Sequence, residues 1–122
     1  MNTRTEKDLL GYKEIPAHCY YGVQTLRAME NFNLSQNKLS HFPVFIKALA
    51  MVKSACAHAN LKLNKLDENK NNAIQYACQQ ILNNQYHDQF PIDMIQGGAG
   101  TSTNMNINEV LANIGLEYLE HL

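Results

Sequence analysis

The sequence predicts a mainly α-helical domain built from about three main helices. Three stretches repeat apolar residues at helical spacing, whereas the segment before them is rich in polar and turn-forming residues. A chain of 122 residues is long enough for one domain with a buried core. We therefore expect one domain over residues 9–122 and a flexible polar tail over residues 1–8.

The segment over residues 9–35 is expected to be irregular. Pro16 and Gly22 interrupt any regular element there. Between them, Cys19–Tyr21 could form a short β-strand, because aromatic residues favour strands.

The first main helix is expected to begin near Pro43 and to end near Leu63. Proline is well tolerated in a first helical turn, where its missing N–H has no partner to lose. The apolar stripe expected to face the core consists of Phe42, Phe45, Ile46, Leu49, Val52 and Cys56.

The second main helix is expected to begin after Asp67, a favourable N-cap, with Glu68 near the positive end of the helix dipole. It should end around Asn83. Its expected buried face consists of Ala73, Ile74, Ala77, Cys78, Ile81 and Leu82.

The third main helix is expected to run from about Thr103 to Leu122. Its apolar stripe contains Ile107, Val110, Leu111, Ile114 and Tyr118. No glycine cap, proline or polar tail follows the stripe. Either the helix frays at this point or it continues in a longer protein, and local signals favour neither alternative.

Composition excludes several classes of function. The chain has 10 basic and 11 acidic residues, a formal net charge of −1, which argues against nucleic acid as a partner. The longest purely apolar run, Ala48–Val52, is far too short to cross a membrane. The polar N-terminus has no signal-peptide core, and the three cysteines are widely spaced, so we expect a cytoplasmic protein with reduced thiols. Cys56 and Cys78 are expected to pack as small hydrophobic residues.

A glycine-rich loop is the strongest candidate for a binding site. Three of the six glycines fall within Gly97–Gly100, and Thr101–Asn104 follow directly at the expected helix start. Glycine lets a backbone approach a ligand, and the free N–H groups of a helix start attract anions. Two interpretations remain open from the residues alone: a small-anion site, or a turn whose hydroxyl residues only cap the helix.

Other chemistry has little support in the sequence. No lysine follows the last glycine, and Thr103 stands where a dinucleotide-binding loop has its third glycine. The histidines lack metal-ligand spacing, so no metal site is expected. The carboxylates are scattered, and no acid–base pair can be assigned.

The residues from Gln96 to Asn113 resemble the aspartase/fumarase superfamily, in the form found in its aspartate ammonia-lyase branch. Fumarases usually carry Thr-Gly-Ser-Gly-Thr where this chain has Gly97–Thr101. Further matching segments occur in the same order as in the family: residues 8–11, 15–17, 20–28, 30–32 and 88–91.

This resemblance implies a reversible, cofactor-free elimination of ammonia from L-aspartate to give fumarate. In the family, a serine on a mobile loop removes a proton beside the β-carboxylate, and hydrogen-bond donors hold the resulting aci-carboxylate. Carried over to this sequence, Thr101 is one of those donors. Ala99, Gly100 and Ser102 belong to the same carboxylate-binding turn.

The resemblance also implies an incomplete active site. Family members have several hundred residues, and the loop that carries the general-base serine is absent here. We therefore expect residues 9–122 to be an N-terminal lyase domain without a catalytic residue of its own, inactive alone and part of a homotetramer at full length. The alternatives are a fumarase-type hydratase domain and a non-catalytic interaction domain with the same fold.

Overall fold

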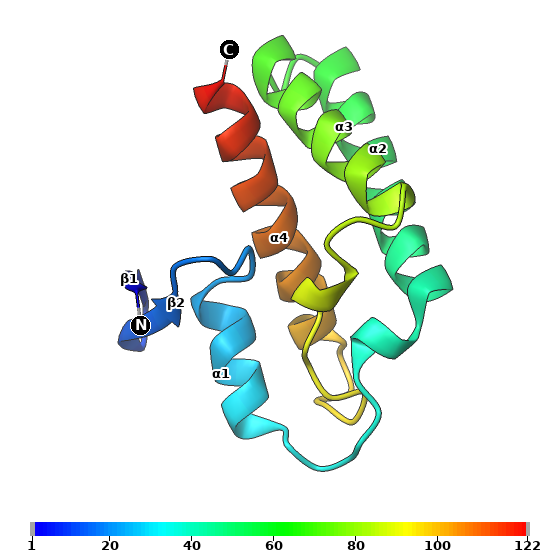
Figure 1. The fold of residues 1–122 in the computed structure, drawn as a ribbon. Coiled ribbons are helices and arrows are strands. Elements are labelled where there is room, and N and C mark those ends of the chain that lie inside the picture. The colour runs from blue at the N-terminus through cyan, green and yellow to red at the C-terminus, as the bar shows by residue number, and fades with distance from the viewer. Residues whose placement is uncertain (1, 122) are drawn as a thin grey trace.

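The computed structural model describes residues 2–121, and its regular elements are mainly helical (Figure 1). Two short 3₁₀ helices, Leu39–His41 and His87–Gln89, lie in the connections between the longer elements. The longer elements, in chain order, are β1 (Thr3–Asp8), β2 (Gly11–Pro16), α1 (Val23–Asn31), α2 (Pro43–Lys62), α3 (Glu68–Leu82) and α4 (Thr101–Glu120).

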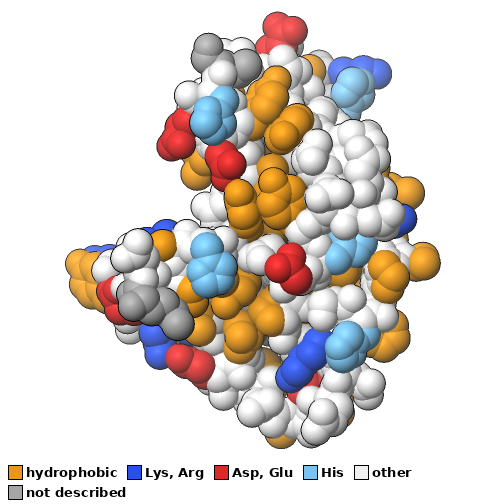
Figure 2. Space-filling view, viewed as in Figure 1, with side chains coloured by type: hydrophobic (Ala, Val, Ile, Leu, Met, Phe, Trp, Pro, Cys, Tyr) orange, Lys and Arg blue, Asp and Glu red, His pale blue; other side chains and the backbone are white. Residues whose placement is uncertain are grey.

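The long helices form a layer in which α3 packs against both α2 and α4. The α1 helix packs against α4, and the N-terminal hairpin packs against α1 (Figure 1). Figure 2 shows the molecule hollowed between this hairpin and the C-terminal end of α4. No helix within residues 2–121 is long and apolar enough to span a membrane.

The N-terminal segment differs from the predicted tail. Residues 3–8 form β1, which pairs with β2 in an antiparallel hairpin from Thr3 opposite Pro16 to Asp8 opposite Gly11. Residue 1 lies outside the described residues. The strand escapes sequence analysis because its residues are nearly all polar, while its pairing depends on backbone hydrogen bonds.

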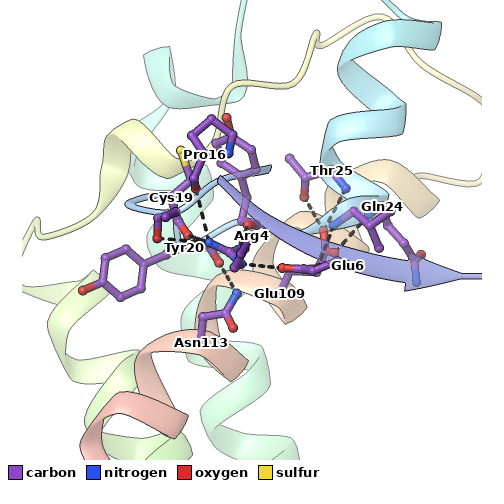
Figure 3. Close-up of polar contacts among 12 residues, drawn as sticks. Arg4, Glu6, Pro16, Cys19, Tyr20, Gln24, Thr25, Glu109 and Asn113 are labelled. Atoms are coloured by element: carbon purple, nitrogen blue, oxygen red, sulfur yellow. Dashed lines mark hydrogen bonds and ion pairs between the residues drawn. The ribbon is translucent and has the colours of Figure 1, made fainter. Parts of the chain in front are cut away.

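The predicted strand over Cys19–Tyr21 is wrong, because these residues form a bend. The Arg4 guanidinium organises this bend (Figure 3). It donates hydrogen bonds to the carbonyl of Cys19 at 2.6 Å and to that of Tyr21 at 2.7 Å, and longer ones to Pro16 and Ala17 at 3.3 Å.

The α1 helix lies within the segment that was expected to be irregular. Its N-cap is Gly22, which has no side chain to accept a hydrogen bond. Two carboxylates from distant elements take over this role (Figure 3). Glu6 of β1 accepts from the N–H of Val23 at 3.1 Å, and Glu109 of α4 accepts from those of Gln24 at 3.0 Å and Thr25 at 2.8 Å. The helix start therefore depends on tertiary contacts.

The α2 and α3 helices confirm the predicted ranges closely. Pro43 is the first residue of α2, and the Asp67 carboxylate caps α3 by accepting from the N–H of Lys70 at 2.8 Å. The α4 helix begins at Thr101, two residues before the predicted start, and ends at Glu120, while Leu122 lies outside the described residues.

The core confirms the expected faces of α3 and α4 and corrects that of α2. Buried side chains include Ala77, Cys78, Ile81, Ile107, Val110, Leu111 and Ile114. On α2, only Ile46, Ala50 and Ala57 are buried. Of the predicted α2 stripe, Phe42, Phe45, Val52 and Cys56 are exposed. The α2 helix packs mainly against α3 and little against α4, so part of the apolar stripe stays exposed.

Candidate anion-binding site

The glycine-rich loop ends at Gly100, which is the N-cap of α4. Gly100 has φ 72° and ψ 18°, a left-handed conformation that glycine adopts without steric cost. The helix cap is therefore this glycine, so the alternative in which a hydroxyl residue caps the helix is not found. Thr101 and Ser102 lie in the first turn of α4, where their hydroxyls have no hydrogen-bond partner among residues 2–121.

Gln96 fixes the shape of the loop. Its Oε1 accepts hydrogen bonds from the N–H and from the hydroxyl of Thr103, both at 3.1 Å. Its Nε2 donates to the carbonyl of Asp93 at 3.1 Å. The N–H of Gly100 donates to the carbonyl of Gly97 at 3.2 Å and closes the turn. The first N–H groups of α4, those of Thr101 and Ser102, are left without a partner within the described part of the chain.

Asp93 anchors the start of the loop. Its buried carboxylate accepts from the N–H groups of Leu34 at 2.8 Å, Ser35 at 2.6 Å and Ile95 at 2.8 Å, and from the Ser35 hydroxyl at 2.8 Å. The N–H bonds of Ile95 and Ser35 hold the pKa of Asp93 well below its usual range. The loop therefore leaves from a rigid, negatively charged support.

Two open pockets meet at the start of α4. Both are lined by Phe32, Thr101 and Ser102, and their volumes are about 190 and 240 Å³. The larger pocket is also lined by Gly97, Gly98 and Ala99. The structure thus places Ala99, Thr101 and Ser102 around the same pocket. Gly100 lines neither pocket and instead turns the backbone between them.

The other wall of the smaller pocket was missed in the sequence. Its lining includes Gln24, Arg27 and Asn31 of α1. Arg27 is held by Asp8, with Nε–Oδ2 at 2.8 Å and Nη2–Oδ1 at 2.9 Å. This hydrogen bond from Arg27 lowers the pKa of Asp8. The i, i+3, i+7 spacing of the three residues would have placed them on one face if residues 23–31 had been recognised as a helix.

This arrangement is suited to a small anion. It combines free hydroxyls, unpaired N–H groups and the positive end of a 20-residue helix. Within residues 2–121, no three His, Cys, Asp or Glu residues gather in a way that could hold a metal ion.

Comparison with known proteins decides the family. The profile of the lyase family matches residues 11–122. The chain belongs to the lyase family. Within this lyase family, it is 58% identical over 120 residues to an aspartate ammonia-lyase of Pseudomonas aeruginosa and 57% identical over 121 residues to one of Escherichia coli K12. Each match covers 98% of this chain and 25% of the relative.

Solved structures of lyases share the fold. A fumarate lyase:delta crystallin of Brucella melitensis has 54% identity and a TM-score of 0.95, covering 98% of this chain and 28% of that one. A class II fumarase of Schistosoma mansoni has 34% identity and a TM-score of 0.93, covering 99% of this lyase chain and 25% of that one. The chain therefore spans about a quarter of the length of the relatives it matches.

Proposed function

We propose that this chain is the carboxylate-binding domain of a lyase that converts L-aspartate reversibly to fumarate and ammonia. The start of α4 carries this proposal: Thr101 and Ser102, whose hydroxyls and N–H groups have no partner among residues 2–121, line two open pockets. Identities of 57–58% to aspartate ammonia-lyases support the choice of substrate.

The chemistry follows from the charge that develops during elimination. A base takes the proton from the carbon beside the β-carboxylate, and the electron pair of that C–H bond moves into the carboxylate. In a second step this pair forms the C=C bond as the C–N bond breaks and ammonia leaves. The β-carboxylate passes through a dianionic aci-carboxylate. The hydrogen bonds from Thr103 to Gln96 hold the first turn of α4 in place. Donors in that turn stabilise this dianion more than they stabilise the ground-state carboxylate.

Thr101 is the principal donor in this proposal, and Ser102 with the backbone of Ala99–Gly100 completes the turn. The base belongs to the remainder of the polypeptide, which makes up the larger part of each relative. No cofactor is needed, since the elimination removes a proton and releases ammonia without net oxidation or reduction. We further propose a cytoplasmic homotetramer at full length.

A chimeric enzyme tests this proposal. The chain replaces the matching 121 residues of the 57% identical Escherichia coli lyase. Fumarate absorbance should rise with L-aspartate for the chimeric enzyme and should stay flat for the isolated chain. Turnover by the isolated chain would contradict the proposal, and so would a chimeric enzyme that is folded by circular dichroism and thermal melting but inactive.

Fumarate hydration is the second candidate, favoured by the match to the Schistosoma mansoni fumarase. The same chimeric enzyme is incubated with fumarate, once with and once without ammonium. Aspartate formation supports the first proposal, whereas malate formation without ammonium supports hydration.

A further inference from the structure

An apolar groove lies on the part of the molecule formed by α2, α3 and α4, separate from the loop site. Its volume is about 370 Å³. Cys56 and Ala57 of α2, Ile74 of α3, and Leu111 and Ala112 of α4 line it. The α3 helix packs against both α2 and α4, whereas α2 and α4 have few contacts with each other. The groove therefore has α2 and α4 as its walls and α3 as its floor. This shape suits another helix.

Exposed apolar residues continue along α2 and α4 beyond the lining of the groove. Val52 lies one turn before Cys56 on α2 and is 58% exposed, and Phe45 on the same stripe is 44% exposed. Leu116, one turn after Ala112 on α4, is 58% exposed. Figure 2 shows hydrophobic side chains along the right-hand edge, where α2 lies. Exposed apolar side chains that gather in this way are typical of an interaction site.

Charge narrows the choice of what covers the groove. Among the residues that line the groove, Lys53 of α2 is charged, and its Nζ donates a hydrogen bond to Oδ1 of Asn104 on α4. The α4 border adds the neutral Asn108. An element with an apolar ridge and an acidic residue opposite Lys53 therefore complements the groove, whereas a basic residue there would meet like charge.

We propose that this groove seats an amphipathic helix from the remainder of the lyase polypeptide, the larger part of the relatives' length that lies outside the matched region. The proposal depends on the proposed function only in taking the chain as part of a full-length lyase. The relatives' matched region is 25% of their length, so most of their chain must pack outside it. The open groove and exposed stripe offer it the apolar surface.

Cys56 gives a direct test, because it is exposed and lines the groove. Cys19 and Cys78 are buried, and burial raises the pKa of Cys78 to about 11, so neither competes for a thiol reagent. Maleimide labelling of the peptide 54–62 is followed by mass spectrometry in the isolated chain and in the chimeric enzyme. Labelling of Cys56 should be about tenfold or more slower in the chimeric enzyme. A Cys56→Ser, Ala55→Cys variant, with the thiol on the exposed position next to it, should label equally fast in both.

Equal labelling of Cys56 in both proteins would overturn the proposal. Protection that grows with the concentration of the isolated chain would overturn it as well, because the occupant would then be a second copy. These readouts do not depend on turnover, so they fail or succeed independently of the proposed reaction.

A steric variant gives a second measurement. Ala112 and Ala55 are both exposed alanines, and only Ala112 lines the groove. Ala112→Arg and Ala55→Arg should leave the Tm of the isolated chain unchanged. In the chimeric enzyme, only Ala112→Arg should lower the Tm. A chimeric enzyme that tolerates Ala112→Arg as well as Ala55→Arg would contradict the seating of a helix in this groove.

Discussion

The side chain of Gln96 holds Thr103 by two hydrogen bonds, both to its Oε1 at 3.1 Å: one from the N–H and one from the hydroxyl of Thr103. The same amide donates to the carbonyl of Asp93 at 3.1 Å. One residue therefore links the buried support of the loop to the first turn of α4, where Thr101 and Ser102 present their donors.

Replacing Gln96 should loosen the site without removing a donor from it. In the chimeric enzyme, Gln96→Ala should lower kcat/KM for aspartate roughly two- to tenfold, since a neutral hydrogen bond contributes about 0.5–1.5 kcal/mol. Steady-state fumarate formation measures this effect. The exposed Asn69→Ala variant on α3 serves as the control. If Gln96→Ala and this control have equal kcat/KM, the hydrogen bonds of Gln96 do not position the site.

A side chain at Gly22 should displace the two carboxylates that cap α1. A Cβ at this position would lie 2.7 Å from Oε1 of Glu6 and would overlap the Glu109 carboxylate that caps α1. Gly22→Ala should therefore destabilise the chain by about 1–3 kcal/mol. Gly98→Ala is the matched control, because a Cβ there meets no atom within 4 Å. Urea unfolding of both variants measures the difference, and equal midpoints would refute the capping role of the two carboxylates.

Arg4 should not be replaceable by lysine. Its guanidinium donates to four carbonyls of the bend over residues 16–21 and to Glu6 at 2.7 Å. An ammonium group has three donors and lacks the planar fork that reaches these acceptors together. Arg4→Lys should cost about 1–3 kcal/mol of unfolding free energy. Arg4→Lys with wild-type stability in denaturant titration would contradict this account of the bend.

The Asp93 carboxylate should make the stability of the folded chain decrease at low pH. Its folded pKa lies below the ordinary value of about 3.9, so its contribution is complete above that pH and is lost as the pH falls toward the folded pKa. Asp93→Asn should lower the Tm at pH 7, and its Tm should fall less than that of the wild type between about pH 5 and pH 2. Parallel thermal melts over this range make the comparison. Equal slopes for the two proteins would mean that Asp93 does not carry this dependence.

The sequence predicts the elements whose signals are local. Asp67 and Pro43 mark the starts of α3 and α2, and the glycine run marks the loop before α4. The α1 helix has no such signal, because its caps come from Glu6 and Glu109, which are distant in sequence. The hairpin lacks a local signal for a related reason, because β1 is wholly polar and its strand forms only by pairing with β2.

The candidate site also contains residues that local sequence signals indicate and residues that only tertiary packing brings there. Ala99, Thr101 and Ser102 could be predicted, because their loop and helix start are adjacent in sequence. The wall formed by Gln24, Arg27 and Asn31 could not, since it requires both the unrecognised α1 and its packing against α4. The exposed side of α2 also could not be predicted, because periodicity identifies an apolar face without showing which partner covers it.

The central claim is that the Thr101 hydroxyl binds a substrate carboxylate. Thr101→Val keeps the shape of the side chain and removes its donor. Because Thr101 is exposed and its hydroxyl has no partner among residues 2–121, the substitution should leave the Tm unchanged. Thr101→Ser keeps the hydroxyl and serves as the rescue variant.

The most direct measurement is kcat/KM for aspartate in the chimeric enzyme carrying Thr101→Val. A lost hydrogen bond to a charged group costs about 1.5–3 kcal/mol, so the value should fall roughly ten- to a hundredfold, with Thr101→Ser close to the unsubstituted enzyme. A folded Thr101→Val chimeric enzyme with unchanged kcat/KM would contradict the claim.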